Sequence, residues 1–110
     1  MNKQRLEKLE SLSKKIISEF FLEELREIEE EFSLINISKI KISSDLSYLD
    51  IFVSSFKNWE ILCKTLASYA PEINRKLVKN LDIRKIPRVR FKYDESWEIS
   101  SEILNTINNL

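Results

Sequence analysis

The first third of the chain repeats apolar residues at the spacing of a helix. From about Lys3 to Glu31 they recur mostly three or four positions apart, with one step of five before Leu25 and with charged residues between them: Leu6, Leu9, Leu12, Ile16, Phe20, Leu25 and Ile28. This spacing predicts one amphipathic helix. Its apolar stripe can pack against the rest of the chain or bind a partner, and packing is favoured because a chain of 110 residues has little other core to build.

In the middle of the chain the apolar period changes to two. The alternating apolar residues are Ile40, Ile42, Leu49, Ile51 and Val53. They predict two strands, and the polar cluster Ser43-Ser44-Asp45 is expected to turn the chain between them into a hairpin. Ile35 and Ile37 are out of phase with the later isoleucines. A bulge near Ser38 and a later start of the strand both explain that shift.

Two helices are predicted next. Asn58 can cap the first, whose apolar face holds Trp59, Leu62, Cys63 and Leu66. Pro71 suits the first turn of the second, which carries Ile73, Leu77 and Leu81, because proline lacks the N–H that this turn leaves unpaired. Proline also disfavours helical backbone at the preceding residue, so the first of these helices is expected to stop at Ala70.

A third strand and a last helix complete the pattern. Pro87 interrupts helical structure, and Val89, Phe91 and Tyr93 then alternate with Arg88, Arg90 and Lys92. Ser96 can cap a final helix with Trp97, Ile99, Ile103, Leu104 and Ile107 as its apolar positions. The order α-β-β-α-α-β plus a C-terminal helix predicts an α+β fold, a three-stranded sheet with helices packed on one face. Without a repeat or linker, residues 1–110 are expected to form a single domain.

Composition removes most enzymatic solutions. The chain has no His, no Gly and one Cys, so zinc sites, Ser-His or Cys-His pairs, disulfides and glycine-rich phosphate loops are not expected. A hydrolase built on paired carboxylates stays open, although the glutamates of the first helix are better explained as a solvated face. We therefore expect no enzyme, no cofactor, no metal and no small-molecule substrate. Cys63, on an apolar helix face, is expected to be a small core residue and not a reactive thiol.

The chain also lacks the long apolar segment of a membrane span or a signal peptide. We expect a cytoplasmic protein.

Charge is distributed unevenly although the formal net charge is zero. Acidic residues concentrate in the first helix, and cations concentrate on the strands and between Pro71 and Asp94. The candidate phosphate-binding residues are Lys39, Lys41, Arg75, Lys76, Lys79, Arg84, Lys85, Arg88, Arg90 and Lys92. Strand alternation predicts that five of them share one sheet face, where Tyr48 and Phe52 can stack on bases or support packing. Cations opposite a buried face are also explained by solvation or by protection of a strand edge.

Two stretches resemble a known family. Residues 40–54, Ile-Lys-Ile-Ser-Ser-Asp-Leu-Ser-Tyr-Leu-Asp-Ile-Phe-Val-Ser, are similar to the strand, Asp-Leu-Ser turn and strand of ribosome-binding factor A. Residues 81–96 resemble its segment of basic residues, proline, alternating strand and closing Asp-x-Ser. The element order is that of the type II KH fold.

The resemblance implies a KH-like factor that binds the small (30S) ribosomal subunit and its 16S rRNA late in maturation, assists 5′-end processing and matters most in the cold. We also expect a monomer off the ribosome.

The chain departs from the family at two places. Where the family has a small residue, any residue and Gly at the interhelical kink, this chain has Tyr69-Ala70-Pro71. Leu49 stands where the family often has Ala, which suggests a difference in core volume. The alternative function is a small α+β protein-interaction module that uses the first helix and a sheet edge and does not bind RNA.

Overall fold

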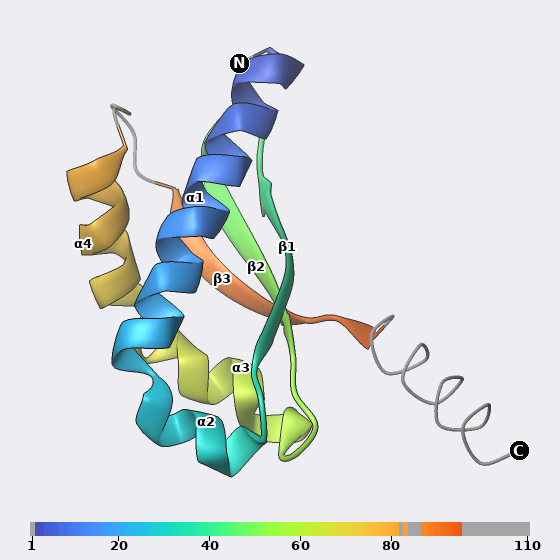
Figure 1. Cartoon of the computed structure of the whole chain (residues 1–110). Helices are drawn as coiled ribbons and strands as arrows, with labels where there is room; N and C mark the ends of the chain where they lie inside the picture. Colours follow the sequence, from blue (N-terminus) through green and yellow to red (C-terminus); the bar gives the residue numbers. More distant parts are fainter. Residues whose placement is uncertain (1, 82, 84–86, 96–110) are drawn as a thin grey trace, which may run out of the picture.

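Helices and strands follow one another as the apolar periods predict. The computed structural model of the protein describes residues 2–81, 83 and 87–95, drawn in colour in Figure 1. Their elements are α1 Lys3–Glu24, α2 Arg26–Phe32, β1 Asn36–Ile42, β2 Tyr48–Ser54, α3 Trp59–Ala67, α4 Ala70–Asn80 and β3 Arg88–Tyr93. The final helix predicted to begin after Ser96 lies outside the described residues.

The first predicted helix is divided in two. α1 ends at Glu24 and α2 begins at Arg26, because Leu25 between them has φ −110° and ψ 20°. The Leu25 side chain is buried in the core, and its N–H still donates to the carbonyl oxygen of Phe21 at 3.2 Å. The chain therefore bends at the buried Leu25 without losing this hydrogen bond. After the bend, α2 runs toward the end of the sheet where β1 begins (Figure 1).

The buried face of α1 also differs from the predicted stripe. Phe20 is buried as predicted, but Ile17, which is not part of that stripe, is buried as well, whereas Leu12 of the stripe keeps 45% of its surface exposed. α1 packs against β1 on one side and against α4 on another. The contacts of α1 with β1 and α4 therefore determine which of its residues are buried. The spacing of apolar residues in the sequence does not by itself identify them.

The hairpin of β1 and β2 is confirmed. The two strands are antiparallel, and the register shifts between Ile37 and Lys39, so the bulge explains the change of phase. In the turn, Asp45 accepts hydrogen bonds from the Ser43 hydroxyl at 2.9 Å and from the Ser47 backbone N–H at 3.0 Å. Short polar side chains thus satisfy this turn, as the sequence predicts.

The sheet is mixed, with strand order β1-β2-β3. β2 is central and pairs in parallel with β3, which places Tyr48 opposite Arg88 and Asp50 opposite Arg90. A parallel pair needs a crossover, and α3 and α4 supply it. The sequence pattern alone left this strand order open.

Two predictions about the crossover helices are wrong in detail. Asn58 precedes α3, but its side chain makes no cap; φ is 56°, and Nδ2 donates to the Glu31 carbonyl oxygen at 2.8 Å, which ties the start of α3 to α2. Proline at position 71 lies in the first turn of α4, yet Ala70 is already helical, and α3 ends earlier, at Ala67. The steric bias against helical backbone before proline is a preference and not a prohibition, and here it acts only on Ala70, the first residue of α4.

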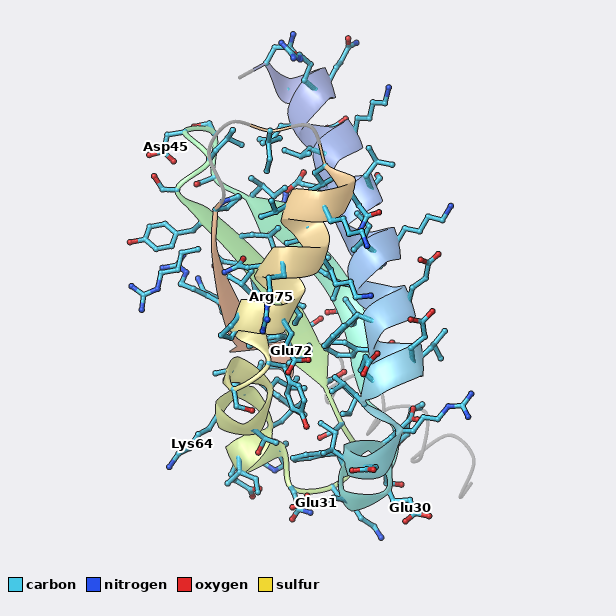
Figure 2. The ribbon with its side chains drawn as sticks, turned by 90° about the vertical axis from the view of Figure 1, so that its left-hand side faces the viewer. Glu30, Glu31, Asp45, Lys64, Glu72 and Arg75 are labelled. Carbon is cyan, nitrogen blue, oxygen red and sulfur yellow. The ribbon has the colours of Figure 1, made fainter. Side chains whose placement is uncertain are left out.

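All the helices of the described part that pack on the sheet do so on one face (Figure 1). The core between the two layers consists of Ile17, Phe20, Leu25, Phe32, Ile40, Ile42, Leu49, Ile51, Val53, Leu62, Leu66, Ile73, Leu77, Leu81 and Val89. Strand alternation therefore sends every second residue of the sheet into this core and leaves the others on the opposite face. Figure 2 shows side chains that project from the sheet on the side away from α4.

Candidate nucleic-acid interface

The face of the sheet that the described helices leave open carries the charged residues of all three strands. By the strand register it holds Lys39, Lys41, Tyr48, Asp50, Phe52, Arg88, Arg90 and Lys92. Five cations and one carboxylate thus share one surface. The prediction that these five cations lie on the same face is confirmed by their positions in the sheet, while their role in binding stays a proposal.

Asp50, at the centre of this face, binds two of the cations. Arg90 Nε lies 2.7 Å from Asp50 Oδ1 and Arg90 Nη2 lies 3.1 Å from Oδ2, so the pair is bidentate. Lys92 Nζ lies 3.2 Å from the same Oδ2. Only 14% of the Asp50 side chain is exposed, against 41% of Arg90. The carboxylate is therefore largely covered by cations that remain partly open to solvent.

The electrostatics of the pair follow from this geometry. Burial by itself would raise the pKa of Asp50, but hydrogen bonds from Arg90 and Lys92 and their positive charges outweigh it and hold the pKa below its usual value. The hydrogen bond to Asp50 raises the pKa of Arg90 in turn. Asp50 and Arg90 therefore both stay charged at neutral pH.

The two aromatic residues of this face are covered by cations. Arg90 Cζ lies 3.8 Å from the centre of the Tyr48 ring, and Lys39 Nζ lies 4.6 Å from the centre of the Phe52 ring. Tyr48 is still 38% exposed. Sequence reasoning named Tyr48 and Phe52 as possible base-stacking residues but missed that cations lie on both rings.

The second predicted cationic patch lies elsewhere. Arg75, Lys76 and Lys79 are exposed on α4, on the helical side of the sheet (Figure 2). They line two hollows between α1 and α4 together with the acids Glu19, Glu23, Glu24 and Glu72. Sequence reasoning missed this proximity, since only the packing of α1 on α4 brings the two sets together. Arg84 and Lys85 lie outside the described residues.

The turn between α3 and α4 packs onto α1. Tyr69 and Ala70 are half-buried, and the Tyr69 ring meets the Phe20 ring edge-on with centres 6.4 Å apart. Pro71 is exposed. No residue of this turn has positive φ, so the turn does not need glycine.

The outer edge of β1 is partly closed by α1. Glu10 Oε2 accepts a hydrogen bond from the Ile42 backbone N–H at 2.8 Å, and Lys14 Nζ donates to the Ser38 carbonyl oxygen at 3.5 Å. These backbone groups are the ones that an added strand would use. A partner strand would therefore have to displace both side chains.

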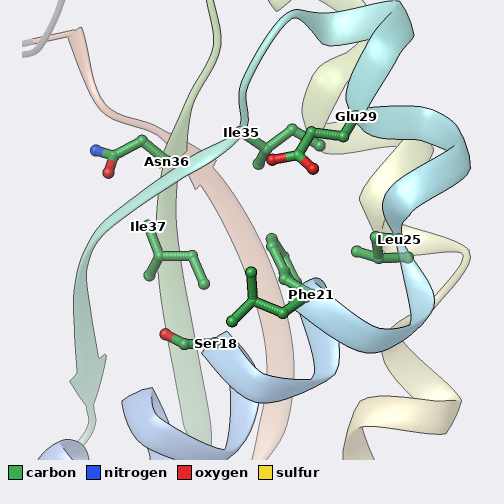
Figure 3. A pocket seen from close by; sticks show the side chains of 8 residues that line it. Ser18, Phe21, Leu25, Glu29, Ile35, Asn36 and Ile37 are labelled. Carbon is green, nitrogen blue, oxygen red and sulfur yellow. The ribbon is translucent and has the colours of Figure 1, made fainter.

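One apolar pocket lies between the end of α1 and the start of β1 (Figure 3). Its volume is about 260 Å³, and its lining residues are Ser18, Phe21, Leu22, Leu25, Glu29, Ile35, Asn36 and Ile37. A paired-carboxylate hydrolase needs two acids that converge. Glu29 is the one carboxylate in the lining of this pocket, so the pocket does not provide such a pair.

Three other possibilities for the described residues are a metal site, a reactive cysteine and a membrane-spanning helix. No group of three or more His, Cys, Asp or Glu side chains there could hold a metal ion. Cys63 is half-buried, and burial raises the pKa of its thiol, which makes it less reactive. None of the described helices combines the length and the apolar character required to cross a bilayer.

Sequence and structure comparisons agree on the relatives of this chain. A ribosome-binding factor A from Synechocystis is 32% identical over 109 residues, 96% of this chain and 82% of the relative. One from Petrotoga mobilis is 32% identical over 111 residues, 100% of this chain and 94% of the relative. The crystal structure of ribosome-binding factor A from Thermus thermophilus matches with a TM-score of 0.70 at 20% identity, over 80% of this chain and 94% of that one.

A second solved structure, a Thermotoga maritima protein, matches with a TM-score of 0.68 at 26% identity, over 84% of this chain and 89% of that one. These likenesses and the observed topology agree with the type II KH-like fold. The sequence profile of ribosome-binding factor A matches residues 5–107. Nearly the whole chain is covered, and it therefore belongs to the ribosome-binding factor A family.

Proposed function

We propose that this protein binds the small ribosomal subunit through its 16S rRNA during late maturation and assists processing at the 5′ end of that RNA, most importantly in the cold. Membership of the ribosome-binding factor A family supports binding to the subunit. The open sheet face supports RNA as the component bound, because five cations there are opposed by one carboxylate. This face is the single observation that carries the proposal.

The same proposal extends to the form in which the protein acts. Residues 1–110 fold as one domain, work as a monomer off the ribosome in the cytoplasm, and contribute binding instead of catalysis. The candidate binding residues on the sheet are Lys39, Lys41, Arg88, Arg90 and Lys92. Those on α4 are secondary because acidic side chains line the same hollows.

The alternative is a protein-interaction module that uses α1 and the sheet edge. The contacts of Glu10 and Lys14 with β1 disfavour strand addition there, since they occupy two of the backbone groups concerned. An apolar contact and a phosphate contact also respond differently to salt, and this difference allows an experimental decision.

The test is sedimentation of the purified protein with isolated small subunits at rising salt. We expect the affinity to fall at least tenfold between about 50 and 200 mM salt, because several Lys and Arg side chains would release counterions from the RNA. Binding that does not change with salt would contradict the proposal and favour the interaction module. Cell extract supplies a second test, in which the protein should travel with free small subunits and not only with mature ribosomes.

A further inference from the structure

The side chains of the open sheet face form a regular array of short rows across the strands. Lys41, Asp50 and Arg90 make the central row, Tyr48 and Arg88 the row on one side of it, and the row on the other side consists of Lys39, Phe52 and Lys92. Successive rows are two residues apart along each strand, about 7 Å. A planar cation at the centre therefore has further cations on both sides.

The guanidinium group of Arg90 is fixed in this array from two directions. Its edge is held by the two hydrogen bonds to Asp50, of 2.7 and 3.1 Å, and one side lies against the Tyr48 ring. The Arg90 side chain nevertheless keeps 41% of its surface exposed. The Arg90 guanidinium plane is therefore fixed in orientation and still accessible to solvent.

This surface has the chemistry of a stacking partner for a nucleobase. Unpaired RNA bases stack on aromatic rings and on arginine guanidinium planes, whereas an A-form duplex hides the faces of its bases. Lys41 and Arg88 lie in the central and neighbouring rows and are exposed, where they can meet the phosphates of the same strand. The core of a protein interface, by contrast, is depleted in charge.

We infer that the Arg90 guanidinium, held by Asp50 and backed by Tyr48, stacks an unpaired RNA base while Lys41 and Arg88 bind the adjoining phosphates. The inference rests on the proposed function, because that proposal makes RNA the ligand. It goes further by specifying unpaired RNA and by naming the side chains that bind it. Asp50 acts through Arg90 and is a positioning residue.

Substitution of Asp50 separates this inference from simple charge attraction. Asp50→Asn makes the face more positive, so attraction alone predicts tighter RNA binding, whereas a disordered Arg90 predicts weaker binding of unpaired RNA. We expect at least a threefold loss of affinity for a fluorescent eight-nucleotide single-stranded RNA of mixed sequence, measured by anisotropy on the full chain. Affinity for a blunt-ended RNA duplex, which has no unpaired bases, is tested in parallel and should not fall.

Glu30→Gln is the matched control, because it adds the same charge at an exposed position of α2. It should leave both affinities within twofold. Arg90→Lys supplies a second variant that keeps the charge but removes the plane, and we expect it to lower single-strand affinity at least fivefold. Arg26→Lys is its control on α2. Circular dichroism melting shows whether each variant is folded.

The outcomes separate this inference from the proposed function. If folded Asp50→Asn or folded Arg90→Lys binds the single strand as tightly as wild type, the stacking site is wrong. In that case the proposed function would still stand if the wild-type protein sediments with small subunits. If instead both variants show the expected losses and wild type does not bind small subunits, the stacking site stands and the proposed function falls.

Discussion

Asp50 is the residue on which the open face depends, because it holds Arg90 and Lys92 together. Its pKa is lower in the folded protein than its usual value. The ionised carboxylate therefore stabilises the fold fully above its unfolded pKa of about 3.9, and this contribution is lost as the pH falls through the lower folded pKa. We expect the difference in free energy of unfolding between wild type and Asp50→Asn to be constant above about pH 5 and to shrink toward pH 3.

Urea denaturation of both proteins at several pH values between 3 and 7 measures this difference. A difference that is the same at pH 3 as at pH 6 would show that the ion pairs do not stabilise the fold. The direction matters, since repulsion among the cations alone would give no loss of this kind on acidification.

Leu49 is a second residue whose role the structure defines. Its side chain is 1% exposed and lies in the core. We expect Leu49→Ala to lower the free energy of unfolding by about 3 kcal/mol, because the lost side chain leaves a cavity in a packed core. Leu22→Ala, at a site that is 67% exposed, is the control and should change it by less than about 0.5 kcal/mol. A loss below about 1 kcal/mol at Leu49 would mean that the core closes around alanine.

At the scale of elements, the turn between α3 and α4 makes Pro71 informative. It lies exposed in the first turn of α4, a place where its fixed φ suits the helix and its missing N–H costs nothing. Pro71→Gly should destabilise the fold by about 1 kcal/mol, because glycine gives the unfolded chain more freedom. The denaturation midpoint measures this loss, and Pro71→Ala should lose less.

Small-subunit affinity should be retained in folded Pro71→Gly, because Tyr69 still holds the turn against Phe20 and the cations of α4 share their hollows with acids. If the affinity falls together with the stability, then the turn positions α4 for RNA and our ranking of the two cationic patches is wrong.

The elements themselves and the hairpin turn between β1 and β2 were largely predictable from the sequence, whereas the other connections were not. Strands β1, β2 and β3 follow directly from apolar alternation, since one face of each is buried. The bend at Leu25 and the side-chain contact of Asn58 with Glu31 depend on tertiary packing, which no local period contains. The five cations of the sheet could be placed on one face, but the pairing of Asp50 with Arg90 required the parallel register of β2 and β3.

At the scale of the whole molecule, the candidate binding cations that the structure describes form two sets on opposite sides of the sheet. Lys39, Lys41, Arg88, Arg90 and Lys92 lie on the open face, and Arg75, Lys76 and Lys79 lie on α4 across the sheet from it. One carboxylate accompanies the first set, whereas four carboxylates line the hollows beside the second. Phosphates respond to local potential, so the open face should attract RNA more strongly than α4.

Charge reversal of each set tests this ranking with variants that change the net charge equally. Lys41→Glu with Arg88→Glu should lower small-subunit affinity at least tenfold, because both side chains are exposed and each reversal removes a phosphate contact and adds repulsion. Lys76→Glu with Lys79→Glu should lower it less than threefold, since these lysines already lie beside Glu19 and Glu23. Sedimentation with isolated small subunits at one fixed salt concentration compares them, after melting curves show that both are folded. A larger loss from the α4 pair would transfer the binding surface to the helices, and an equal loss would mean that only the net charge of the protein matters.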